Sequence, residues 1–158
     1  MSGHRIDLDR QVQASVEVVW EVLTDVRHAD RTLSGVQRVE VLTDGPYRVG
    51  TQWRETRRMF GKEATEQMEV TAVEAPSRTV VEADSSGVHY VTEFTLTPVS
   101  AEMTRLAMGF SAEQGRASLV HKVLWALFGR MGARATAKVM AQDLQDVAAR
   151  AEELSRPS

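Results

Sequence analysis

The hydrophobic pattern of the chain changes near residue 117, after a series of predicted strands, from the two-residue period of strands to the longer period of a helix. Before that point, short alternating segments are separated by turn signals such as Asp44-Gly45-Pro46 and Ser85-Ser86-Gly87. From Ala117 onward, apolar residues recur at helical spacing as far as Ala151. An antiparallel meander followed by one long amphipathic helix must bury the apolar face of its sheet against that helix.

The same pattern predicts the order of the elements. We expect a strand at Ile6–Asp9, a helix at Val16–Val26 capped by Ser15, and a second short helix or turn at Asp25–Leu33. Six further strands are predicted at Val36–Leu42, Val49–Met59, Glu63–Val73, Arg78–Asp84, His89–Thr97 and Thr104–Ala112. The fold class is therefore α+β, with about seven strands curved around a long C-terminal helix. We expect a single domain over residues 1–158, with an ordered core at about 4–154.

Composition excludes several classes of function. Cysteine is absent, which excludes disulfides, thiolate metal sites and cysteine nucleophiles. The net charge is −3 and the densest basic cluster is only Arg54, Arg57 and Arg58, so no nucleic-acid partner is expected. His28, His89 and His121 lack the spacing of metal ligands, and no phosphate loop or dinucleotide fingerprint occurs, so we expect neither metal nor cofactor.

Neither a signal peptide nor a membrane-spanning segment is expected from the sequence. Met1–Asp9 has no apolar stretch of the kind found in signal peptides. The longest uninterrupted apolar run, Val123–Phe128, is too short to span a bilayer. We therefore expect a cytoplasmic protein without stable membrane insertion; the oligomeric state stays open.

Alternation along the strands predicts which side chains face the helix. With the turn at Gly61-Lys62 and Phe60 opposite Glu63, the inner face pairs Arg57 with Glu66. The other inward pairs of that hairpin are Trp53 with Val70, Glu55 with Met68, and Met59 with Ala64. A register shift of two residues would change these partners but keep the faces.

Several segments resemble the helix-grip superfamily (SRPBCC), which includes START-like lipid-transfer domains, the birch-pollen allergen group and polyketide cyclase/dehydrase-like proteins. The similar segments are VEVVWEVLTD at Val16–Asp25, VGTQWR at Val49–Arg54, VTAVEAPSR at Val70–Arg78 and FTLTP at Phe94–Pro98. The resemblance implies a deep cavity between the sheet and the long helix. It also implies apolar ligands such as lipids, sterols or polyketides, with catalysis in some members and protein binding in others.

Two groups of residues are candidates for a site. Glu55, Arg57 and Glu66 form the charged group, in which a glutamate could act as a general base while Arg57 holds a developing enolate or carboxylate. Tyr90 completes the predicted catalytic set of Glu55, Arg57 and Tyr90. The alternative for this group is a structural ion pair near the cavity mouth. The predicted ligand-binding residues are Trp53, Glu66, Met68, Phe94, Met108, Phe110, Trp125 and Phe128, for which the alternative is a filled core.

Three hypotheses for the function are compatible with the sequence. The leading hypothesis is a protein that binds a hydrophobic small molecule. The second is a polyketide cyclase or dehydratase, since orientation alone can contribute much to the cyclisation of a flexible chain. The third is a co-chaperone-like module that binds other proteins, which would need an exposed apolar patch instead of an enclosed cavity.

Overall fold

Seven strands and four helical segments make up the part of the chain that the computed structural model describes, residues 4–59, 61–85, 88–114 and 130–157. The strands are β1 His4–Val12, β2 Val36–Val41, β3 Gln52–Met59, β4 Lys62–Glu74, β5 Arg78–Ser85, β6 Val88–Ser100 and β7 Met103–Gln114. Between β1 and β2 lie α1 Val16–Thr24, η1 Val26–His28 and α2 Ala29–Thr32, and the C-terminal helix is α4 Arg130–Ser155. The predicted element order is confirmed; the helical pattern at 117–129 lies outside the described residues.

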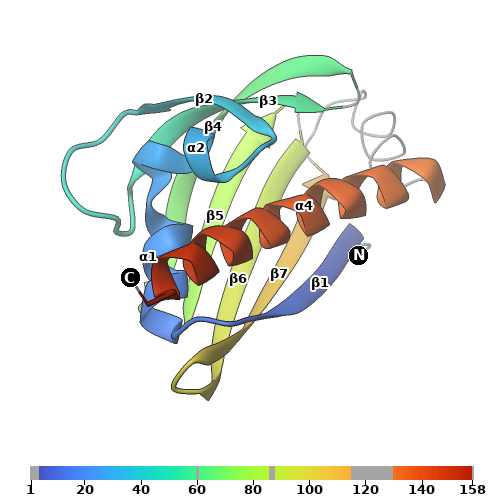
Figure 1. The fold of residues 1–158 in the computed structure, drawn as a ribbon. Coiled ribbons are helices and arrows are strands. Elements are labelled where there is room, and N and C mark those ends of the chain that lie inside the picture. Colours follow the sequence, from blue (N-terminus) through green and yellow to red (C-terminus); the bar gives the residue numbers. More distant parts are fainter. Residues whose placement is uncertain (1–3, 60, 86–87, 115–129, 158) are drawn as a thin grey trace.

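The strands form one antiparallel sheet in the order β1-β7-β6-β5-β4-β3-β2. Each strand from β2 to β7 pairs with its neighbour in sequence, while β1 joins the sheet beside β7. Figure 1 shows the sheet curving behind α4, whose C-terminal end lies next to α1. This is the helix-grip arrangement that the sequence predicts.

Helix α1 begins where the sequence places its cap. The Ser15 hydroxyl accepts the backbone N–H of Val18 at 3.3 Å, and Glu17 lies in the first turn. Val19 and Val22 are buried on the inner side of this helix. The apolar spacing that predicts the helix therefore also anchors it to the sheet and to α4.

The register of the β3–β4 hairpin differs from the prediction by two residues. Met59 pairs with Lys62, so Glu55 lies opposite Glu66 and Arg57 lies opposite Ala64. Gly61 has a φ of 78°, a left-handed conformation that glycine adopts easily, and the chain turns one position earlier than expected. The predicted pairing of Arg57 with Glu66 is wrong, but the predicted faces hold because a two-residue shift preserves the pleat.

The main apolar core lies where β1, β6 and β7 meet α1 and α4. Leu96 and Leu106 are among its fully buried side chains, and the α4 side contributes Met140, Leu144, Val147, Ala148 and Ala151. A smaller cluster of Trp53, Val70 and Val81 belongs to β3, β4 and β5. None of the described helices is long and apolar enough to cross a membrane.

Candidate functional site

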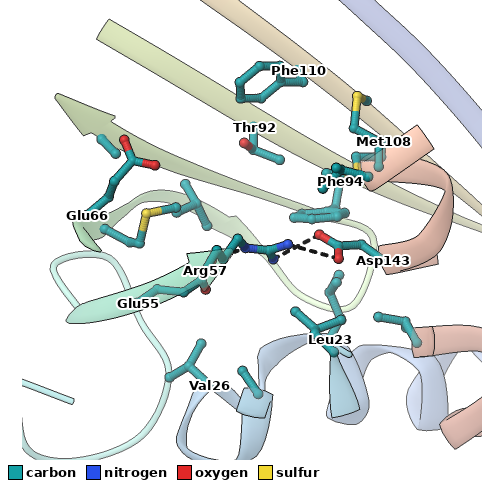
Figure 2. A pocket seen from close by; sticks show the side chains of 18 of the residues that line it. Leu23, Val26, Glu55, Arg57, Glu66, Thr92, Phe94, Met108, Phe110 and Asp143 are labelled. Atoms are coloured by element: carbon teal, nitrogen blue, oxygen red, sulfur yellow. Dashed lines mark hydrogen bonds and ion pairs between the residues drawn. The ribbon is translucent and has the colours of Figure 1, made fainter. Parts of the chain in front are cut away.

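A cavity of about 350 Å³ lies between the sheet and α4, and members of both apolar clusters border it. Its walls come from the helical segments after β1, from strands β3 to β7 and from α4 (Figure 2). All the predicted site residues within the described ranges line it: Trp53, Glu55, Arg57, Glu66, Met68, Tyr90, Phe94, Met108 and Phe110. The predicted ligand-binding residues Trp125 and Phe128 lie outside the described residues.

The inward direction of these side chains follows from strand alternation. Trp53, Glu55 and Arg57 are successive inward residues of β3, as Tyr90, Thr92 and Phe94 are of β6. The face assignment was therefore predictable from the period alone. What lies opposite each side chain across the cavity was not.

Arg57 is held by two carboxylates in the cavity wall. Its Nε donates to Glu55 Oε2 at 2.6 Å, and its two terminal nitrogens donate to Asp143 Oδ1 and Oδ2 at 3.0 and 2.9 Å. The Trp53 indole N–H donates to the other Glu55 oxygen at 3.3 Å. The side chains of Arg57, Glu55 and Asp143 are only 15%, 11% and 12% exposed, so this cluster is a largely desolvated ion network.

Sequence reasoning missed Asp143. It belongs to α4, three residues after Met140 and four before Val147, and these helical spacings place it on the buried face. An acidic residue inside an otherwise apolar helical stripe was the signal that could have identified it. Its partner could not be read from the stripe, because Arg57 is on a strand 86 residues away in sequence.

The ion network keeps the guanidinium charged. Burial alone would lower the pKa of Arg57, but Glu55 and Asp143 outweigh that effect and the pKa is raised. Burial raises the pKa of Asp143, an effect that the contact with Arg57 opposes. The bidentate geometry is the one in which arginine binds a carboxylate most strongly.

Glu66 and Tyr90 form a second polar group in the cavity. Burial raises the pKa of Glu66, against a lowering hydrogen bond with Ser85. Burial, together with the charge of Glu66, raises the pKa of Tyr90 to about 12, so the phenol is neutral at neutral pH. The Tyr90 ring stacks on Phe110 with centroids 5.7 Å apart and planes at 14°.

Tyr47 is a further cavity residue that sequence reasoning missed. It lies in the connection between β2 and β3, and its ring meets Trp20 edge-on at 6.4 Å. Its hydroxyl lies 2.7 Å from the Thr79 hydroxyl, which itself donates to the Ala72 carbonyl at 2.9 Å. Since a threonine hydroxyl has one proton, Tyr47 must be the donor to Thr79. An aromatic residue in a connection has no periodic pattern that could have marked it as a wall of the cavity.

Nothing in the described ranges brings together three or more His, Asp or Glu side chains that could hold a metal ion. The described cavity residues supply carboxyl, phenol, hydroxyl, ammonium and guanidinium groups, most of them in apolar surroundings. Such groups can bind polar substituents and transfer protons.

One protein family matches nearly the whole chain. The family model described as polyketide cyclase / dehydrase and lipid transport matches residues 3–152. No curated protein sequence matches the chain.

Solved structures share the fold at low sequence identity. The Zhui aromatase/cyclase from Streptomyces sp. R1128 superposes with a TM-score of 0.81 at 21% identity, covering 98% of this chain and 97% of that one. A START superfamily protein from Mycobacterium smegmatis gives 0.77 at 13% identity, covering 96% and 99%. Norcoclaurine synthase from Thalictrum flavum gives 0.70 at 17% identity, covering 98% of each chain. At these identities the likeness shows the fold alone.

Proposed function

This chain belongs to the family of polyketide cyclases, dehydrases and lipid-transport proteins, and from this premise we propose that it binds a hydrophobic small molecule, lipid-like or polyketide-like. The ligand occupies the cavity between the sheet and α4. The predicted ligand-binding residues Trp53, Glu66, Met68, Phe94, Met108 and Phe110 form its described walls.

The observation that carries this proposal is a cavity of about 350 Å³ with mainly apolar walls. Protein interiors are packed as densely as organic crystals, and a gap of this size is far larger than ordinary packing leaves. The volume falls in the range of small-molecule sites, and apolar walls with a few polar groups are typical of them.

Native mass spectrometry of the freshly purified protein tests for a bound molecule, and titration with the neutral dye Nile red tests the cavity directly. Ala83 lies on the cavity wall, so Ala83→Phe should occupy part of the space and weaken dye binding, at a loss of no more than about 1–3 kcal/mol in the free energy of unfolding. Ala101→Phe makes the same change in an exposed turn and should leave binding intact. If Ala83→Phe binds the dye as tightly as the unchanged protein does, that result would count against the proposal.

A second candidate function is cyclisation or dehydration of a polyketide-like chain, with Glu55, Arg57 and Tyr90 as the predicted catalytic set. The observation that favours it is the partly buried Glu66 near Tyr90: burial raises the pKa of Glu66, and a carboxyl group in such surroundings can transfer protons. A poly-β-ketone thioester surrogate should then lose water faster with the protein than in buffer, and more slowly with Tyr90→Phe. A rate equal to that of buffer would leave only the binding function.

The co-chaperone-like hypothesis has the least support. The exposed large hydrophobic side chains among the described residues are Leu42, Val49, Val99 and Leu154, which belong to three separate parts of the chain. A cytoplasmic location stays a prediction from the sequence.

A further inference from the structure

The polar groups of the cavity differ in what they can offer a ligand. Nε and both terminal nitrogens of Arg57 already donate to carboxylate oxygens of Glu55 and Asp143. Two anions therefore surround one cation, and the guanidinium offers no unneutralised positive charge to a ligand. A ligand carboxylate at this place would have to compete with two carboxylates that are built into the walls.

The formal charges of the described walls point the same way. Four carboxyl side chains line the cavity, Asp25, Glu55, Glu66 and Asp143, against two cations, Arg57 and Lys62. Lys62 is exposed at the β3–β4 hairpin, while Arg57 is engaged. An anionic ligand would enter a desolvated space whose walls carry net negative charge, and this repulsion lowers its affinity.

Two hydroxyl groups on β6, unlike the guanidinium of Arg57, are available to a ligand. Tyr90 and Thr92 both line the cavity, and neither hydroxyl has a hydrogen-bond partner within the described part of the chain. No fully buried side-chain nitrogen or oxygen of the described residues lacks a partner. These two hydroxyls therefore reach the open space of the cavity, where a ligand can bind them.

Glu66 lies near Tyr90 in the cavity wall. Met68, Ala83 and Tyr90 are side by side across β4, β5 and β6, and Glu66 is the next inward residue of β4. The charge of Glu66 is felt at Tyr90. Figure 2 shows Glu66 and Thr92 apart from the contact between Arg57 and Asp143. Together, Glu66 offers an acceptor and the Tyr90 hydroxyl offers both a donor and an acceptor.

The surrounding surface suits an aromatic ring. Tyr90 stacks on Phe110, and Phe94 and Met108 continue the same wall. Aromatic and thioether side chains contact ligand rings favourably at their faces and edges.

We propose that Glu66 and Tyr90 form the polar anchor of the cavity, that they hold the hydroxyl of a neutral hydroxyaromatic ligand, and that the cavity discriminates against the corresponding carboxylate. The inference rests on the proposed binding function and names the ligand chemistry of that same cavity. The ligand hydroxyl donates to Glu66 and accepts from Tyr90. Arg57 supports the wall and does not contact the ligand.

Three probes that share one ring system separate these statements: biphenyl, para-phenylphenol and para-phenylbenzoate, titrated by calorimetry or equilibrium dialysis at neutral pH. Biphenyl tests the apolar cavity alone. We expect para-phenylphenol to bind about three- to ten-fold more tightly than biphenyl, as one or two hydrogen bonds would give. We expect para-phenylbenzoate to bind at least about ten-fold more weakly than the phenol.

Near-isosteric variants test the anchor. Tyr90→Phe should reduce the advantage of the phenol over biphenyl, while Glu66→Gln should raise the affinity for para-phenylbenzoate. Tyr47→Phe is the matched control, because it removes a hydroxyl of the same cavity that already donates to Thr79. It should leave the ratio of phenol to biphenyl affinity unchanged. Thermal melting of each variant establishes that it is folded.

The outcomes distinguish the two proposals. If biphenyl binds but the phenol gains nothing, or the carboxylate binds as tightly as the phenol, the anchor is wrong and the apolar cavity stands. The anchor is also wrong if Tyr90→Phe leaves the phenol advantage intact, or if Tyr47→Phe alone removes it. If none of the three probes binds, the binding function fails and the anchor fails with it.

Discussion

At the scale of single residues, Arg57 is a charged side chain held in a largely buried place. Its side chain lies in apolar surroundings, and its charge is tolerable there because two carboxylates accept its hydrogen bonds. Alternation along β3 predicts that Arg57 and Glu55 face inward. Asp143 comes from α4, and only the tertiary structure makes it the main partner of Arg57.

Removing Arg57 should therefore cost stability. Arg57→Met leaves two buried carboxylates without a cation, and we expect a loss of about 3–5 kcal/mol in the free energy of unfolding. The double variant Arg57→Met with Asp143→Leu should lose less than the sum of the single changes, with a coupling of about 1–3 kcal/mol. Chemical denaturation of the four proteins measures this.

The surface provides the matched control for that cycle. Arg105 pairs with Asp9 at 2.6 Å, but the two side chains are 54% and 47% exposed. Arg105→Met should change the free energy of unfolding by no more than about 1 kcal/mol. Equal losses at the two arginines, or strict additivity of Arg57 and Asp143, would contradict the structural role of the buried network.

At the scale of elements, the two faces of the sheet carry different interactions. On the face away from the cavity, His89 of β6 contacts Asp84 of β5 at 2.8 Å and Glu82 of β5 at 2.5 Å. The pKa of His89 is raised by the hydrogen bonds to Asp84 and then to Glu82. The sequence predicts His89 on this outer face from alternation, but the two acidic partners follow only from the β5–β6 register.

This contact makes the pairing of β5 with β6 dependent on pH. Because the folded-state pKa is above the unfolded value, the stabilisation is complete below about pH 6.5 and is lost as the pH rises through the raised pKa. His89→Gln should therefore lower the melting temperature by at most a few degrees at mildly acidic pH and hardly at all at alkaline pH. A difference between the two proteins that stays constant over this range would show that protonated His89 is not the stabilising species.

At the scale of the whole molecule, the space beneath α4 is divided between a packed core and a cavity. Leu106, fully buried, belongs to the packed core, whereas the half-buried Met68 borders the cavity. The helix stripe predicts that α4 covers the sheet. Which part of the covered face is filled and which is hollow depends on the distance between sheet and helix, and that distance has no periodic signature.

This division predicts an unequal response to truncation. Leu106→Ala should cost about 2–5 kcal/mol in the free energy of unfolding, since it opens a new cavity in close-packed surroundings. Met68→Ala should cost clearly less, because one side of Met68 already faces open space and has fewer contacts to lose. Denaturant titration of both variants measures the difference, and an equal or larger loss for Met68→Ala would mean that the interior is filled.

Local chemistry in the sequence determined the strand meander, the Ser15 cap of α1 and the inward faces that carry Trp53, Glu55 and Tyr90. These features depend on residue period and turn residues, which act over a few positions. Tertiary structure decided the β3–β4 register, the partnership of Arg57 with Asp143 and the hollow beside Met68. Each of these depends on the distance in space between segments that are remote in sequence. A hydrophobic pattern that repeats every two or four residues does not determine that distance.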